Sequence, residues 1–221
     1  MKLFCPYFST LIEVSEGDPF SLVIENQSLF RRFLEDLHIQ ASGGEGTSVL
    51  SINNAPVPIH KYVDVIENFA PFEINTKTLL SKISTAVEKT AVDEKHYLET
   101  SQMLANIETY LSELCFGFPL RVECRKLSAG AIIKSASLAI VEDFEQPTEA
   151  ILSYMSTLLD FDKTKLFITV NIRSYFDDYT MLEFTREIRK KQLCVLMLES
   201  TAHATLPGTK RLVIDRDLCE F

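Results

Sequence analysis

Two mainly apolar stretches decide the fold of this chain: KLFITV at residues 165–170 and LCVLML at residues 193–198. Neither stretch alternates apolar with polar residues, so a strand built from either one is expected to be buried on both faces. Between them, Met181, Phe184 and Ile188 recur at the spacing of an amphipathic helix. Doubly buried strands joined by a helix are typical of a parallel sheet in an α/β protein.

The same alternation of strands and helices extends along the chain in both directions. Further strands are predicted at residues 11–14, 20–24, 49–52, 62–66, 137–141 and 211–214. Further helices are predicted to follow Ser28, as their N-cap, and to begin at Pro147. Residues 75–114 instead carry two successive helical patterns. The fold class is therefore α/β, with a mostly parallel sheet in a head domain (residues 1–74 and 137–221) and a helical leg domain (residues 75–136).

The second of these long helices has a heptad-like spacing. Tyr97, Leu104 and Leu111 lie seven residues apart, as do Ile107 and Leu114. Such a seam predicts a helical hairpin that stands partly clear of the sheet, or a contact between subunits in an oligomer. A plain amphipathic helix that packs on its own domain explains the same spacing, and the sequence leaves both interpretations open.

The charge of the chain limits the kind of nucleic-acid surface it can have. There are 31 acidic and 22 basic residues, a net charge of −9, which excludes a uniformly basic surface. Bases nevertheless concentrate locally, and a concave surface that gathers them can bind phosphates. The candidate DNA-binding residues are Lys163, Lys165, Arg173, Arg186, Arg189, Lys190 and Lys191, with Arg125 and Lys126 behind them. Alternatively, cations at a helix end simply complement the helix dipole.

The sequence offers little for an enzyme. Gly43, Gly44 and Gly46 follow a predicted helix and lack the lysine of a phosphate-binding loop, so they are interpreted as a turn. The five cysteines form no CxxC motif, and no apolar run reaches the roughly 20 residues that cross a membrane. Asn171 and Glu199 end the two decisive strands at the carboxyl edge, where α/β sites lie, so a nucleotide-dependent or hydrolytic enzyme stays the alternative.

Four segments, taken with the order of elements, resemble a known family. They are Phe72–Asn75 with the helix start that follows it, Lys163–Asn171, Val195–Glu199 and Leu212–Asp217. They are similar to segments of the small Csn-type adaptation protein of type II-A CRISPR systems. The resemblance is strongest over the last 75 residues, and no single motif is diagnostic.

The resemblance implies a head domain like a degenerate phosphate-loop ATPase and a helical leg domain. It implies a homotetrameric ring that takes double-stranded DNA ends, independently of sequence, during spacer acquisition in the bacterial cytoplasm. The implied partners are the CRISPR integrase subunits and the effector nuclease, with no nucleotide, no membrane and no catalysis. A protein-interaction subunit without DNA contact is a third interpretation.

The resemblance also implies calcium, bound by acids that follow the long helices. The matching stretch at residues 118–126 departs from that pattern, because Glu123 is its one acid and bases surround it. Further oxygens could come from Glu142, Asp143 and Glu145. We therefore expect any calcium site to use these four residues.

Overall fold

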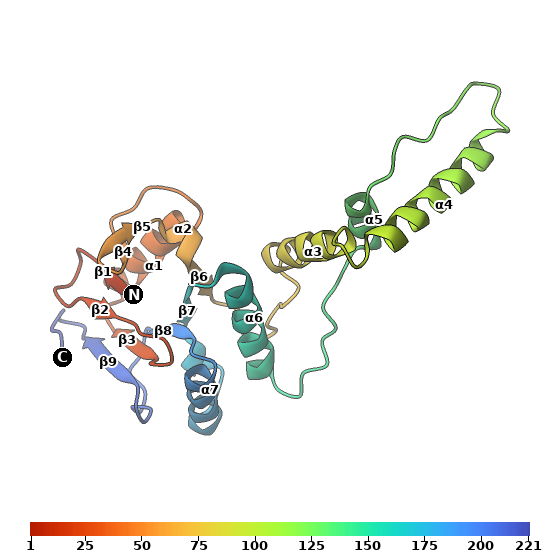
Figure 1. Ribbon diagram of the computed structural model, residues 1–221. Helices are drawn as coiled ribbons and strands as arrows, with labels where there is room; N and C mark the ends of the chain where they lie inside the picture. The colour runs from red at the N-terminus through yellow and green to blue at the C-terminus, as the bar shows by residue number, and fades with distance from the viewer. The chain divides into compact units, whose positions relative to one another are not determined.

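The computed structural model describes residues 1–221 and divides the chain into two compact units. Unit 1 comprises residues 1–73 and 143–221, and unit 2 comprises residues 74–142 (Figure 1). The predicted head and leg are close in extent to these units. Their separate roles stay a prediction.

Unit 1 is built on a five-stranded parallel sheet in the order β6-β7-β8-β3-β9. The strands are β3 (Phe20–Ile24), β6 (Val63–Ile66), β7 (Leu166–Val170), β8 (Cys194–Glu199) and β9 (Lys210–Ile214). Every residue of β7 and β8 is buried, as their unbroken apolar pattern predicts. The predicted α/β fold class with a parallel sheet is thus confirmed.

Helices cover both faces of this sheet. Helix α1 (Gln27–Ala41) contributes Leu29, Phe33 and Leu37 to a core cluster with alternate residues of the strands. The remaining strand residues are buried on the second face, beside α6 (Pro147–Asp162) and α7 (Asp178–Lys190) (Figure 1). Burial raises the pKa of the Cys194 thiol to about 11, so this cysteine serves as a small buried apolar residue of the core.

A second, antiparallel sheet in unit 1 was not anticipated from the sequence. Its order is β2-β1-β4-β5, formed by β2 (Ile12–Glu13), β1 (Lys2–Phe4), β4 (Val49–Ile52) and β5 (Ala55–Val57). Asn53 and Asn54 join β4 to β5 with φ angles of 52° and 62°. Two successive left-handed residues are typical of a tight hairpin turn, and asparagine tolerates that conformation well.

The connection from β3 to α1 is very short. Only Glu25 and Asn26 separate the strand from the helix. The Asn26 side chain caps α1 by accepting a 3.0 Å hydrogen bond from the backbone N–H of Leu29. The prediction that Ser28 caps this helix is therefore wrong by two residues. The α2 helix (Ile59–Tyr62) has only four residues and leads directly into β6.

Unit 2 contains α3 (Lys77–Ala91), α4 (Tyr97–Cys115) and α5 (Ala129–Ala136). The predicted strand at residues 137–141 is wrong, because the chain there forms no strand. Its backbone is bound by a side chain instead: Asn75 Oδ1 accepts from the Ile140 N–H at 2.7 Å, and Asn75 Nδ2 donates to the Ile140 carbonyl at 3.2 Å. None of the seven α-helices is both long enough and apolar enough to cross a membrane.

Candidate functional site

Lysines gather at the amino edge of the parallel sheet. Lys163 is the C-cap of α6, three residues before β7, and Lys191 is the C-cap of α7, three residues before β8. Both side chains are exposed and make no ion pair. Since β7 and β8 are neighbouring parallel strands, with Leu166 opposite Cys194, both lysines stand at one edge. A cavity of ≈190 Å³ at this edge is lined by Lys163 and Gln192, among others.

The structure adds one residue to this edge that the sequence reasoning missed. Lys61 lies in α2, two residues before β6, and it too is exposed without an ion pair. Because β6 pairs with β7, the three adjacent strands β6, β7 and β8 each begin next to one free lysine. Neighbouring strands lie about 4.8 Å apart, so this lysine row (Lys61, Lys163 and Lys191) spans roughly 10 Å of edge.

Other bases at the same edge are engaged within the protein. Lys190 pairs with Glu187 at 3.3 Å, and Arg189 donates to the Pro207 carbonyl at 2.8 Å. Lys210, the first residue of β9, pairs with Asp18 at 2.6 Å, and this hydrogen bond raises its pKa. Glu187 and Asp18 neutralise Lys190 and Lys210, so the net positive charge of this edge comes from Arg189 and from the lysine row.

Two predicted DNA-contacting residues are buried instead. The Lys165 side chain is 8% exposed and pairs with Asp162 at 3.2 Å. The Arg173 side chain is 7% exposed, forms an ion pair with Asp178 and donates to the Ala204 carbonyl at 2.9 Å. DNA contact through either side chain does not fit this burial. Arg186 is exposed on α7 and pairs with Glu183, away from the sheet edge.

In unit 2, Arg125 and Lys126 are exposed in the segment between α4 and α5. The predicted calcium ligands do not gather: Glu123 forms an ion pair with Arg121, and Glu142 accepts a 2.7 Å hydrogen bond from Asn75. No group of three or more His, Cys, Asp or Glu side chains is arranged to hold a metal ion. The set of Glu123, Glu142, Asp143 and Glu145 is divided between the two units, and calcium binding by it stays a prediction.

The α4 helix has no buried residue along its 19 positions. Within the predicted seam, Tyr97 and Leu114 are 57% and 54% exposed, while Leu104, Ile107 and Leu111 are partly buried. Beyond the seam, the apolar side chains of Leu98, Met103, Tyr110 and Phe116 are also exposed. The chain itself thus leaves the apolar surface of α4 largely uncovered.

Polar side chains meet at the carboxyl edge of the sheet, as the sequence predicts. Asn171 follows β7 in a left-handed conformation (φ 55°), and its Oδ1 accepts from the Ser200 N–H at 2.7 Å. Glu199 ends β8 with 1% exposure, and its Oε1 accepts from the Arg173 N–H at 3.3 Å. Burial raises the pKa of Glu199 to about 7, although Arg173 acts in the opposite direction.

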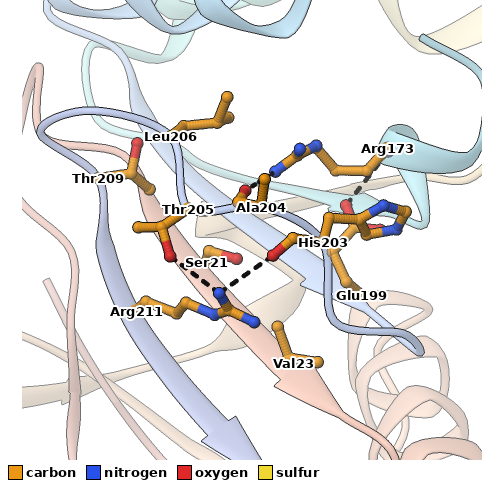
Figure 2. A pocket seen from close by; sticks show the side chains of 10 residues that line it. All are labelled: Ser21, Val23, Arg173, Glu199, His203, Ala204, Thr205, Leu206, Thr209 and Arg211. Carbon is orange, nitrogen blue, oxygen red and sulfur yellow. Dashed lines mark hydrogen bonds and ion pairs between the residues drawn. The ribbon is translucent and has the colours of Figure 1, made fainter. Parts of the chain in front are cut away.

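Glu199 lines a small cavity in unit 1 (Figure 2). Arg173, His203 and Arg211 contribute charge or titratable groups to it, and Ser21 and Val23 of β3 form its floor. His203 Nε2 lies 3.9 Å from Glu199 Oε2, too far for a hydrogen bond. Burial and the nearby Arg173 lower the pKa of His203, so its imidazole is neutral at pH 7. The volume of this cavity is only ≈10 Å³.

No loop of the sheet has the form that cradles a nucleotide. A phosphate-binding loop places GxxxxGK[ST] between a strand and the helix that follows it. Two strands of this sheet lead directly into a helix: the β3–α1 connection holds only Glu25 and Asn26, and the β7–α7 connection, residues 171–177, contains neither glycine nor lysine. Glu25 would moreover repel a phosphate at the β3–α1 turn. The glycine cluster at 43–46 lies after α1 and before β4, where the predicted turn stands.

Comparison with known proteins gives one informative match. The family model described as "CRISPR-associated protein (Cas_Csn2)" matches residues 40–218. A search of curated protein sequences finds no match. Among solved structures, a putative ABC transporter ATP-binding protein from Pyrococcus furiosus is similar over 91% of this chain and 88% of its own. Its sequence identity to this chain is 13% and its TM-score is 0.35.

Proposed function

This chain belongs to the Cas_Csn2 family of CRISPR-associated proteins, and from that premise we propose that it binds double-stranded DNA ends without catalysis. In this proposal it acts as a homotetrameric ring during spacer acquisition, beside the integrase subunits and the effector nuclease. The observation that carries the DNA-binding part is the lysine row at the amino edge of the sheet. Lys61, Lys163 and Lys191 are exposed and unpaired there.

Positive charge gathered at the amino edge of the parallel sheet allows a chain with a negative net charge to bind DNA. At a net charge of −9, the protein as a whole repels a polyanion. Within about one Debye length, roughly 10 Å at ordinary salt, local cations outweigh distant acids. The binding is therefore electrostatic and independent of sequence, because lysine contacts to phosphates carry no base information.

The uncovered α4 helix supports an oligomer. Apolar side chains such as Leu98, Tyr110 and Phe116 are 80%, 60% and 93% exposed in the single chain. Closed symmetric assembly is the usual way to bury such a surface in a homo-oligomer. A ring also explains why the protein would select DNA ends, because a duplex can enter a closed protein ring only from one of its ends.

The two-residue β3–α1 turn supports the absence of nucleotide hydrolysis, because it has no room for a phosphate loop. The alternative enzyme at Asn171 and Glu199 draws support from the raised pKa of Glu199. Against it, Glu199 is 1% exposed and faces a cavity of ≈10 Å³, which admits no organic substrate. Binding is thus the better-supported function.

Light scattering of the purified protein, alone and with a short linear duplex, tests this proposal. Four copies of 25.1 kDa give a particle of about 100 kDa that gains the mass of one duplex at low salt. A particle of 25.1 kDa that gains no mass with DNA contradicts both the oligomer and the binding. Measurable ATP or DNA hydrolysis by the same sample would contradict the absence of catalysis.

A further inference from the structure

The connection between α4 and α5 contains a stretch that is held only at its ends. We call residues 118–126 the basic loop, and all of them except Cys124 are exposed. The Leu127 N–H donates to Glu108 Oε1 at 2.6 Å, but no backbone group of residues 119–126 is bonded to a helix. The basic loop can therefore contact another surface along its length.

Apolar and basic side chains are combined in the basic loop. Phe118, Leu120 and Val122 occupy every second position and are 63%, 79% and 47% exposed. In an extended chain, side chains at alternate positions project to the same side. The loop carries three bases and one acid, a net charge of +2, from Arg121, Arg125, Lys126 and Glu123. Its partner surface should therefore be apolar and acidic.

A groove of unit 1 has an apolar floor. This α6–α7 groove is lined by residues of α6, of α7 and of the chain just before α6, and its volume is ≈530 Å³. Phe144, Leu152 and Phe184 line it, and the last two are only 6% and 1% exposed. Sites of this size, roughly 300–1,000 Å³, can bury several apolar groups at once.

The remaining lining of the groove is acidic. Glu149 of α6 and Glu183 and Glu187 of α7 line it, with Lys191 as the single base, so the lining has a net charge of −2. Glu183 and Glu187 each pair with a base one turn further along α7. Exposed pairs of this kind are weak, so both carboxylates can accept a new cation. The groove thus complements the basic loop in charge and in apolar surface.

Two other occupants fit the groove less well. The acidic lining repels the phosphates of DNA. The α4 helix of another copy offers apolar side chains, but its charged residues are Glu99, Glu108 and Glu113, with no lysine or arginine among its 19 positions. Its negative charge would meet negative charge in the groove. Charge therefore favours the basic loop over α4 as the occupant.

We propose that the basic loop of one copy docks in the α6–α7 groove of a second copy. The inference rests on the proposed homo-oligomer and names a contact within it. Phe118 and Leu120 cover the apolar floor, and Arg125 and Lys126 meet the carboxylates of the groove. In a two-fold pair each copy gives one loop and receives one, so the contact forms twice. Arg125 and Lys126 then contact protein rather than DNA.

Exchange of charge between loop and groove tests the contact. The loop variant is Arg125→Glu with Lys126→Glu, and the groove variant is Glu149→Lys with Glu183→Lys. Each alone sets like charges against each other and should weaken self-association about tenfold or more. Light scattering without DNA, at low salt and micromolar concentration, should then give a particle below the four-copy mass. An equimolar mixture of the two variants should recover that mass, because every loop then finds a groove of opposite charge.

A matched control and an apolar variant complete the test. Lys89→Glu with Lys95→Glu makes the same change in net charge as the loop variant, at exposed positions of unit 2 outside the loop, and should keep the wild-type mass. Phe118→Ser with Leu120→Ser should lower the mass, and mixing with the groove variant should not restore it.

Three results would overturn the docking. Loop and groove variants that both keep the four-copy mass, or a mixture that recovers none of it, refute the contact and leave an oligomer through α4 intact. A wild-type particle of 25.1 kDa refutes the oligomer and the docking together.

Discussion

Removal of the lysine row tests the electrostatic part of the proposed function. The perturbation is Lys61→Ala, Lys163→Ala and Lys191→Ala in one chain, at three exposed positions without ion pairs. No buried contact is lost, so the fold should be retained. Each lysine that touches a phosphate contributes about 0.9 to the slope of log K against log salt. The variant should therefore lose up to about 2.7 from that slope for each subunit that meets the duplex through all three lysines.

The assay is fluorescence anisotropy of a labelled linear duplex over a series of salt concentrations, repeated with two unrelated DNA sequences. Both sequences should weaken alike, because phosphate contacts carry no sequence information. The matched control removes three exposed lysines of unit 2, Lys77, Lys89 and Lys95. Like the lysine-row variant, this control makes the net charge of −9 more negative by three units, but it should leave the slope of log K against log salt nearly unchanged. Equal slopes for wild type and the lysine-row variant, or equal losses in variant and control, would refute the reasoning.

Three further predictions concern other parts of the chain. Glu199→Gln removes a carboxyl whose pKa rises from 4.5 to about 7 in the folded protein, so the stability that this carboxyl contributes is fully present below pH 4.5 and is lost as pH rises through 7. In urea unfolding, the free energy of unfolding of the variant should therefore gain up to about 3 kcal/mol relative to wild type between pH 5 and pH 8. Parallel pH dependences of the two proteins would contradict this. Tyr97→Glu with Leu114→Glu places charge in the predicted seam and should give a 25.1 kDa monomer by light scattering, whereas an unchanged particle mass would remove α4 from the interface. Asn26→Ala removes the α1 cap and should cost about 1 kcal/mol in urea unfolding, with no change expected for Ser28→Ala at the position that the sequence favoured.

The sequence predicts best those strands whose residues are all buried, because an unbroken apolar run then marks the strand. β7 and β8 are buried on both faces, so their runs are unbroken and recognisable. The strands at 11–14 and 49–52 were predicted, but β1 between them in the sheet has only three residues, too few for any periodicity, so their pairing into a second sheet was missed. Asn53-Asn54 between two short runs was the available hairpin signal. The apolar run at 137–141 failed as a strand because the Asn75 side chain, rather than another strand, binds its backbone.

The site was only partly predictable, because residue type does not reveal which way a side chain points. Lys163 and Lys165 are two residues apart, yet one is exposed and the other lies buried against Asp162. Arg173 was identified by its position at the carboxyl edge, where it donates to the Ala204 carbonyl instead of facing solvent. Lys61 was missed because α2 is a four-residue helix without a recognisable pattern, and only the β6–β7 pairing brings it beside Lys163.

The central claim, that a closed ring takes DNA by its ends, is tested most directly by comparing linear and covalently closed circular DNA of equal length and sequence. Both forms carry the same phosphates, so electrostatics alone binds them equally. A preformed ring can be threaded only from an end. The account predicts saturable binding of the linear form at low salt, no binding of the circle, and recovery of binding when the circle is cut once. Equal affinity for the linear and circular forms would contradict the ring.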